Sequence, residues 1–176
     1  HVTASNLYED DFESYPLGTD LTTSVNYTRH PTMNSGDFSV ERVFEAGSSQ
    51  SAMHSKNSSS IPSVFMTKGF DLSRFTLKIS FNTQTIRYNG KFDFKIQLMS
   101  AETSNTTDDD IVLSIGTMNG YIRVETGDSI HSIGHLISQD EWVDCTFYIN
   151  LLEKKFSLTV NPSYSSIVYY NNKNIE

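Results

Sequence analysis

The chain has 176 residues, enough for one domain with a substantial hydrophobic core. Its formal net charge of −8 argues against nucleic acid as a partner, because phosphates require a basic surface, and equally against an anionic membrane surface. No apolar run approaches the roughly 20 residues that span a bilayer, so we expect no membrane insertion. The chain has eleven Phe and nine Tyr but one Trp, and this aromatic content is more typical of half-buried pleated sheets than of helices. The composition therefore predicts an all-β protein.

The N-terminal part of the chain predicts short extended segments joined by polar loops. A short strand within Tyr8–Asp20 is expected to end at the turn Pro16-Leu17-Gly18. Further extended pieces are expected at Phe38–Glu45 and Gly47–Met53. The serine-rich run from Ser48 to Ser63 predicts a surface loop.

From Phe75 onward, apolar and polar residues alternate, which is the pattern of strands with one buried face. Asn119-Gly120 stands between two alternating runs and is the strongest signal for a hairpin turn. No stretch keeps a helical spacing over ten or more residues. Antiparallel strands of this number around one core close as a two-sheet sandwich or as a barrel. The strands are expected at 75–81, 92–99, 111–115, 121–125, 143–151 and 156–160.

The apolar positions of these strands predict one shared core, because a one-residue shift in register would expose all of them. The residues expected in that core are Phe94, Ile96, Leu113, Val124, Phe147, Ile149 and Leu158.

The single cysteine, Cys145, shares its parity with Val143 and Phe147, which predicts a buried small side chain rather than a reactive thiol. Abundant Ser, Thr and Asn favour a secreted or cell-surface location. Because the chain begins at His1 without a methionine, we expect a module of a larger secreted protein, and we expect it to be a monomer.

The run from Asp10 to Asp20, together with Glu141-Trp142-Val143 leading into Phe156–Asn161, resembles the concanavalin A-like lectin and glucanase superfamily, including its laminin-G-like modules. The resemblance covers most of the chain. It implies an antiparallel β-sandwich of jelly-roll type as a single domain over residues 1–176, with a glycan held on a concave sheet. Related modules often bind a structural calcium ion at the N-terminal strand, so the resemblance implies calcium ligands at Asp11 and Glu13.

The polar positions of the strands predict the binding face. Carboxylates, amides and guanidinium groups can form paired hydrogen bonds to vicinal hydroxyls, and a tyrosine ring can stack on a pyranose. An ordinary solvated face with charge pairs, such as Asp93 with Lys95 or Arg123, is the alternative. The residues expected to bind carbohydrate are Asp93, Lys95, Gln97, Tyr121, Arg123, Glu125 and Tyr148.

We predict a secreted, non-catalytic carbohydrate-binding module, with a polysaccharide lyase or glycoside hydrolase using the same groove as the alternative and an adhesion or structural domain third. The Glu-x-Asp-x-x-Glu run of retaining jelly-roll glucanases does not occur. Asp93 and Glu125 could act as a pair only if their strands were neighbours in register. A lyase would need a base and a cation, which Tyr121, Tyr148, Arg123 and Lys95 offer by type. His131 and His135 lie in a loop-like stretch and are read as surface histidines.

Overall fold

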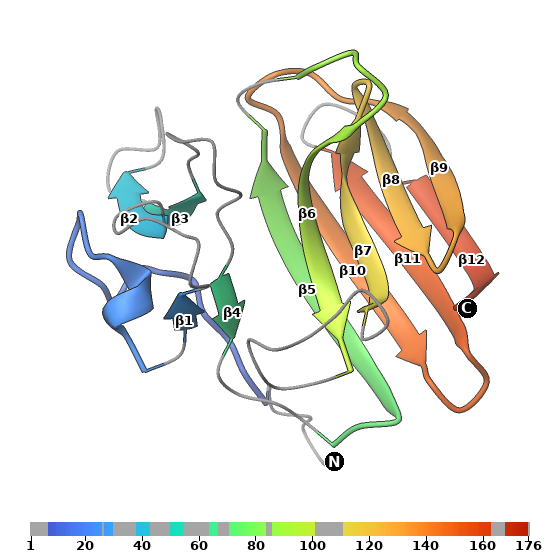
Figure 1. Cartoon of the computed structure of the whole chain (residues 1–176), viewed down its shortest axis with the longest axis horizontal. Coiled ribbons are helices and arrows are strands. Elements are labelled where there is room, and N and C mark those ends of the chain that lie inside the picture. The colour runs from blue at the N-terminus through green and yellow to red at the C-terminus, as the bar shows by residue number, and fades with distance from the viewer. Residues whose placement is uncertain are drawn as a thin grey trace. The chain divides into compact units, whose positions relative to one another are not determined.

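The computed structural model shows an all-β protein (Figure 1). The chain divides into two compact units, His1–Gly69 with Glu102–Asn105 and Phe70–Ala101 with Thr106–Glu176. The prediction of a single domain over residues 1–176 stays a prediction. No helix among the described residues is long and apolar enough to cross a membrane. The structure describes residues 7–25, 27–29, 38–42, 50–54, 64–66, 71–83, 86–100, 111–162 and 168–175.

The first unit contains short elements. The 3-10 helix η1 (Leu21–Thr23) is capped by Asp20, whose Oδ1 accepts a hydrogen bond from Thr22 N at 3.0 Å. Residues 7–19 contain bends and turns but no strand, so the strand expected within Tyr8–Asp20 is wrong. The four strands pair as β1 with β4 and β2 with β3, both antiparallel; they are β1 (Tyr27–Arg29), β2 (Phe38–Arg42), β3 (Gln50–His54) and β4 (Val64–Met66).

The second unit contains two antiparallel four-stranded sheets. The first has the order β12-β11-β10-β5, formed by β5 (Arg74–Asn82), β10 (Trp142–Asn150), β11 (Lys155–Pro162) and β12 (Val168–Asn174). The second has the order β6-β7-β8-β9, formed by β6 (Phe92–Met99), β7 (Ile111–Met118), β8 (Tyr121–Thr126) and β9 (Ser129–Leu136).

One hydrophobic core lies between these sheets, which confirms the predicted two-sheet antiparallel sandwich. The rings of Phe81 from β5 and Phe94 from β6 pack in a T-shaped arrangement, with 5.1 Å between the ring centroids. Strands β6 to β9 follow one another as a meander, as do β10 to β12. The jelly-roll connectivity stays a prediction.

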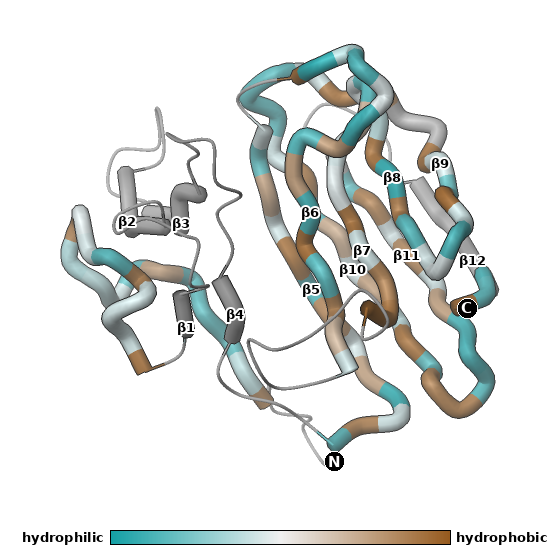
Figure 2. The backbone as a smooth tube through the Cα atoms, viewed as in Figure 1, coloured by the Kyte–Doolittle hydropathy of each residue, from teal (hydrophilic) through white to brown (hydrophobic). Residues whose placement is uncertain are grey.

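The strand alternation places the predicted residues in this core. Figure 2 shows hydrophobic and hydrophilic positions following one another along the strands of the two sheets. Leu113, Val124, Phe147, Ile149 and Leu158 are buried, and Phe94 and Ile96 are partly buried and packed against them. The prediction of one shared core is therefore confirmed.

Cys145 lies in the same core, as predicted. Burial, with the neighbouring Asp144 charge adding to it, raises the pKa of the Cys145 thiol to about 12. The thiol therefore stays protonated at neutral pH.

The predicted hairpin turn at Asn119-Gly120 joins β7 to β8, with Met118 paired to Tyr121. Both turn residues have positive φ, 52° and 78°, as a two-residue turn between twisted strands requires.

Candidate functional site

The outer face of the β6 to β9 sheet brings most of the predicted site residues together. Lys95 lies opposite Gly116, which lies opposite Arg123 and then Ser132. In the next row, Gln97, Ser114 and Glu125 are cross-strand partners. We call this surface the β6–β9 face, defined by Phe92, Lys95, Gln97, Ser114, Gly116, Met118, Tyr121, Arg123, Glu125, Ser132 and Leu136.

The polar groups of this face are joined across the strands. Lys95 Nζ lies 3.2 Å from Glu125 Oε1, and 35% and 27% of the two side chains remain exposed. Gln97 Nε2 donates to Ser114 Oγ at 3.2 Å, and an Arg123 guanidinium nitrogen donates to Ser132 Oγ. Five predicted residues, Lys95, Gln97, Tyr121, Arg123 and Glu125, thus form one continuous surface.

Gly116 lies at the centre of the face and leaves room for these contacts. A Cβ at this position would lie 2.0 Å from the Phe94 carbonyl oxygen and 3.1 Å from Phe92 Cδ1. No side chain fits against that backbone oxygen without movement of β6. Lys95 can therefore reach diagonally over β7 to Glu125, because its own partner on that strand, Gly116, has no side chain.

Two aromatic rings on this face make cation–π contacts. Lys95 Nζ lies 4.9 Å from the centroid of the Phe92 ring, and Arg123 Cζ lies 5.1 Å from that of Tyr121. Such contacts are worth about 0.5–1 kcal/mol at exposed sites. They fix the direction of two long, otherwise flexible side chains and so reduce the entropy lost when a ligand binds.

An exposed apolar edge adjoins the face at the turn between β7 and β8. Tyr88 is 73% exposed and Leu136 is 55% exposed. A Cβ on Gly120 would lie 2.9 Å from Leu136 Cδ1 and 3.4 Å from Tyr88 Cε1, so both side chains lie against this turn. The turn residue Asn119 holds the Tyr88 loop in place, because its Oδ1 accepts a hydrogen bond from Gly90 N at 2.9 Å. The sequence marked Tyr88 only as part of a turn.

Asp93 does not lie with the other predicted residues. A bulge in β6 pairs Phe92 with Met118 and Phe94 with Thr117, which leaves Asp93 as the extra residue. Its Oδ2 accepts a hydrogen bond from Thr117 Oγ1 at 3.2 Å, and the Thr117 side chain is buried. The Asp93 carboxylate therefore points away from the open surface. The strand alternation, which predicted Asp93 on the β6–β9 face, is interrupted at this residue.

Tyr148 also lies elsewhere, on the outer face of the other sheet. It is 55% exposed, between the buried Phe147 and Ile149 of β10. Its outward direction was predicted correctly. The sandwich has two outer faces, however: Tyr148 projects from the sheet of β5, β10, β11 and β12, whereas Tyr121 projects from the β6–β9 face.

The two histidines lie in strand β9, so the expectation of a loop there is wrong. His131 Nε2 lies 3.0 Å from Thr126 Oγ1, and its ring packs edge-on against Phe156, with 6.0 Å between centroids. His131 therefore supports the packing of the sheets rather than the outer face.

The predicted calcium ligands lie in an exposed turn. Asp11 Oδ1 accepts a hydrogen bond from Glu13 N at 3.0 Å. In the part of the chain that the structure describes, no group of three or more His, Cys, Asp or Glu side chains is placed to hold a metal ion. These two side chains alone do not form a calcium site, and calcium at Asp11 and Glu13 stays a prediction.

Asp10 is the organised carboxylate of this segment, which the sequence did not single out. Its Oδ2 accepts hydrogen bonds from the phenols of Tyr27 at 2.8 Å, Tyr15 at 3.0 Å and Tyr8 at 3.4 Å. Burial first, and then the hydrogen bonds of this cluster, raise the pKa of the Tyr27 phenol. The Tyr27 phenol therefore stays protonated as a donor, and Asp10 ties the N-terminal turn to β1.

Comparisons of the chain with models of protein families, with curated protein sequences and with solved structures gave no match. The resemblance to the concanavalin A-like superfamily therefore stays a prediction. The geometry of the two outer faces is the basis for inferring a function.

Proposed function

We propose that the β6–β9 face binds an oligosaccharide or polysaccharide without cleaving it. One observation supports this proposal above the others: the register of β6, β7 and β8 gathers Lys95, Gln97, Tyr121, Arg123 and Glu125 on one partly exposed surface. Tyr88 and Leu136 extend that surface with an exposed apolar edge.

The chemistry of the face suits a sugar. Glu125 and the Gln97 amide oxygen accept hydrogen bonds, while Lys95, Arg123 and the Gln97 nitrogen donate them, as pairs of vicinal hydroxyls require. The partly exposed pair of Lys95 and Glu125 is worth only about 0.2–1 kcal/mol. Opening it toward sugar hydroxyls therefore costs little, whereas the rings of Tyr88 and Tyr121 offer surfaces for stacking.

A polysaccharide lyase is the second candidate, and one observation favours it. Tyr121, Arg123 and Lys95 share the face, so a phenol lies beside cations that could neutralise a uronate carboxylate. A two-carboxylate hydrolase has less support, because Asp93 turns from the surface where Glu125 lies. An adhesion or structural domain that contacts protein through Tyr88 and Leu136 ranks third.

We further propose that the protein acts as a monomeric module of a secreted or cell-surface protein. The Ser, Thr and Asn content supports this location, and the lone buried Cys145 needs no reducing compartment because it is shielded from oxidants.

Tyr121→Ala and Arg123→Ala should each weaken glycan binding by about 1–3 kcal/mol, through lost stacking and lost charged hydrogen bonds. A glycan array identifies a neutral ligand, and titration calorimetry then measures its affinity for each variant. Tyr148→Ala is the matched control, because it removes the same side-chain type from the opposite face. Melting temperatures should barely change in any of the three.

Two outcomes would contradict this proposal. Unchanged affinity in both Tyr121→Ala and Arg123→Ala would move the site off the β6–β9 face. Release of reducing ends or unsaturated uronates by the wild type, lost in Tyr121→Ala, would establish the lyase instead.

Calcium at Asp11 and Glu13 has its own test. An ion that binds only the folded state stabilises it by mass action, so EDTA should lower the melting temperature of the wild type. The double variant Asp11→Asn, Glu13→Gln should show no such response, because its ligands are gone. An equal melting temperature with and without EDTA in the wild type would make both residues ordinary surface acids.

A further inference from the structure

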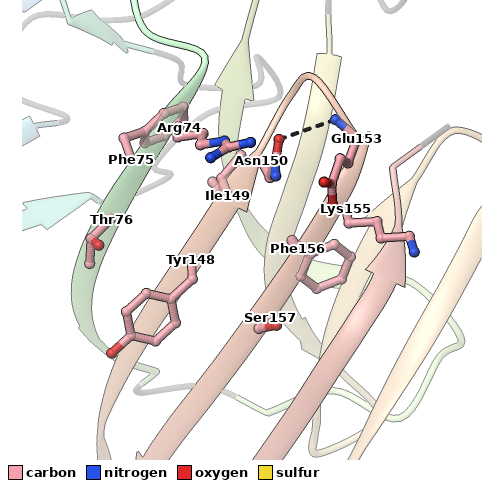
Figure 3. Close-up of a pocket in the computed structure, with 10 residues that line it drawn as sticks. All are labelled: Arg74, Phe75, Thr76, Tyr148, Ile149, Asn150, Glu153, Lys155, Phe156 and Ser157. Carbon is pink, nitrogen blue, oxygen red and sulfur yellow. Dashed lines mark hydrogen bonds between the residues drawn. The ribbon is translucent and has the colours of Figure 1, made fainter.

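The outer face of the β5-β10-β11-β12 sheet carries an open hollow of about 480 Å³ (Figure 3). The hollow lies at the end of the sheet where β10 turns into β11. Its volume falls in the range of about 300–1,000 Å³ that is usual for small-ligand sites. The polar residues that line it are Arg74, Thr76, Tyr148, Asn150, Glu153, Lys155 and Ser157.

Tyr148 stands between two short side chains in this hollow. Its cross-strand partners are Thr76 on β5 and Ser157 on β11, and Figure 3 shows the ring projecting between them. Because neither neighbour is long enough to cover the ring, 55% of Tyr148 is exposed. A planar ring flanked by hydroxyl groups is suited to stack under a sugar and bind its hydroxyls.

Two cations lie in the row beside Tyr148, toward the turn between β10 and β11. Arg74 and Lys155 are the cross-strand partners of Asn150, in the row next to Tyr148, and Figure 3 shows Arg74 extending toward Asn150. Lys78 follows Arg74 on the same side of β5, beyond Thr76. Across the described ranges, none of these three exposed cations has a carboxylate within 4.0 Å.

Such a cluster is notable on a chain of net charge −8. The acidic residue in the lining is Glu153, which lies in the turn after β10 and whose backbone nitrogen donates to Asn150 Oδ1 at 3.1 Å. Within the lining, the two cations Arg74 and Lys155 outnumber the one carboxylate, so this end of the face is locally positive and attracts anions.

We propose that this hollow binds an acidic sugar residue, with its carboxylate or sulfate on Arg74, its ring over Tyr148 and Lys155 as a second cationic contact. The guanidinium group can hold either anion with two parallel hydrogen bonds. This site goes beyond the proposed function, because it lies on the opposite sheet and takes a charged ligand that the β6–β9 face does not require.

The test is calorimetry with three oligosaccharides on the full chain: a heparin fragment for sulfate, an oligogalacturonate for carboxylate and a cello-oligosaccharide as the neutral control. At least one acidic probe should bind and the neutral probe should not contact this hollow. Arg74→Ala and Tyr148→Ala should each weaken the acidic probe about tenfold or more, as loss of a charged hydrogen bond or a stacking ring does. Glu153→Gln should strengthen binding, because it removes the opposing charge.

One control variant separates this site from general attraction to positive charge. Lys91→Ala removes a positive charge at the loop before β6, away from the hollow, and should leave affinity for the acidic probe nearly unchanged. Equal losses in Arg74→Ala and Lys91→Ala, or no binding of either acidic probe, would overturn the proposal without bearing on the β6–β9 face.

Discussion

Phe147→Ala should lower the free energy of unfolding by about 3–5 kcal/mol, the usual cost of removing a large aromatic side chain from a core. Phe147 is fully buried at the middle of β10 and pairs with Leu77 on one side and Leu158 on the other. Its ring centroid lies 6.1 Å from that of Phe156, so its loss opens a cavity that the rigid sheet cannot close.

Urea denaturation measures this effect, with Tyr148→Ala as the matched control on the same strand. Because Tyr148 points outward, its truncation should change stability by no more than about 0.5 kcal/mol. Domains of this size are stable by about 5–15 kcal/mol, so the Phe147 variant should remain folded but melt far earlier. A larger loss in Tyr148→Ala than in Phe147→Ala would show that the inner and outer faces of β10 are exchanged.

The same neighbouring residues show how far sequence determines the fold. The alternation of Val143, Cys145, Phe147 and Ile149 is local, and it predicted correctly which side of β10 is buried. It also predicted that Tyr148 and Tyr121 both point outward. It could not assign them to faces, because that depends on β10 pairing with β5, a contact between strands far apart in the chain.

Asp93 departs from the expected alternation for a different reason. Phe92 to Leu98 reads as an unbroken alternation, and nothing in those residues marks a bulge. The extra residue becomes visible only in the register against β7, where Phe92 and Phe94 pair with adjacent residues. Strand β9 was missed because Ser129–Leu136 mixes histidines and serines with its apolar residues, which hides the two-residue period.

The bulge also explains the glycine beneath the candidate site. The φ of Gly116 is not in the left-handed region, so its backbone conformation alone does not require glycine. The requirement comes from the Phe94 carbonyl oxygen, which would lie 2.0 Å from a Cβ, closer than atoms of these types can approach. Gly116 therefore serves both the fold and the proposed site: it fits the bulge, and it leaves the space that the Lys95 side chain spans.

Gly116→Ala should therefore lower the free energy of unfolding by about 3 kcal/mol, at the upper end of the usual cost of overpacking. It should also weaken glycan binding, because β6 can relieve the contact only by moving Lys95 away from Arg123 and Glu125. Gly90→Ala is the control: a Cβ there meets nothing within 4 Å, but φ is +72°, so a cost of about 1 kcal/mol in stability with full binding is expected. Equal stability and binding in the Gly116 and Gly90 variants would mean that the Phe94 carbonyl does not lie over Gly116. That result would also contradict the bulge that separates Asp93 from the β6–β9 face.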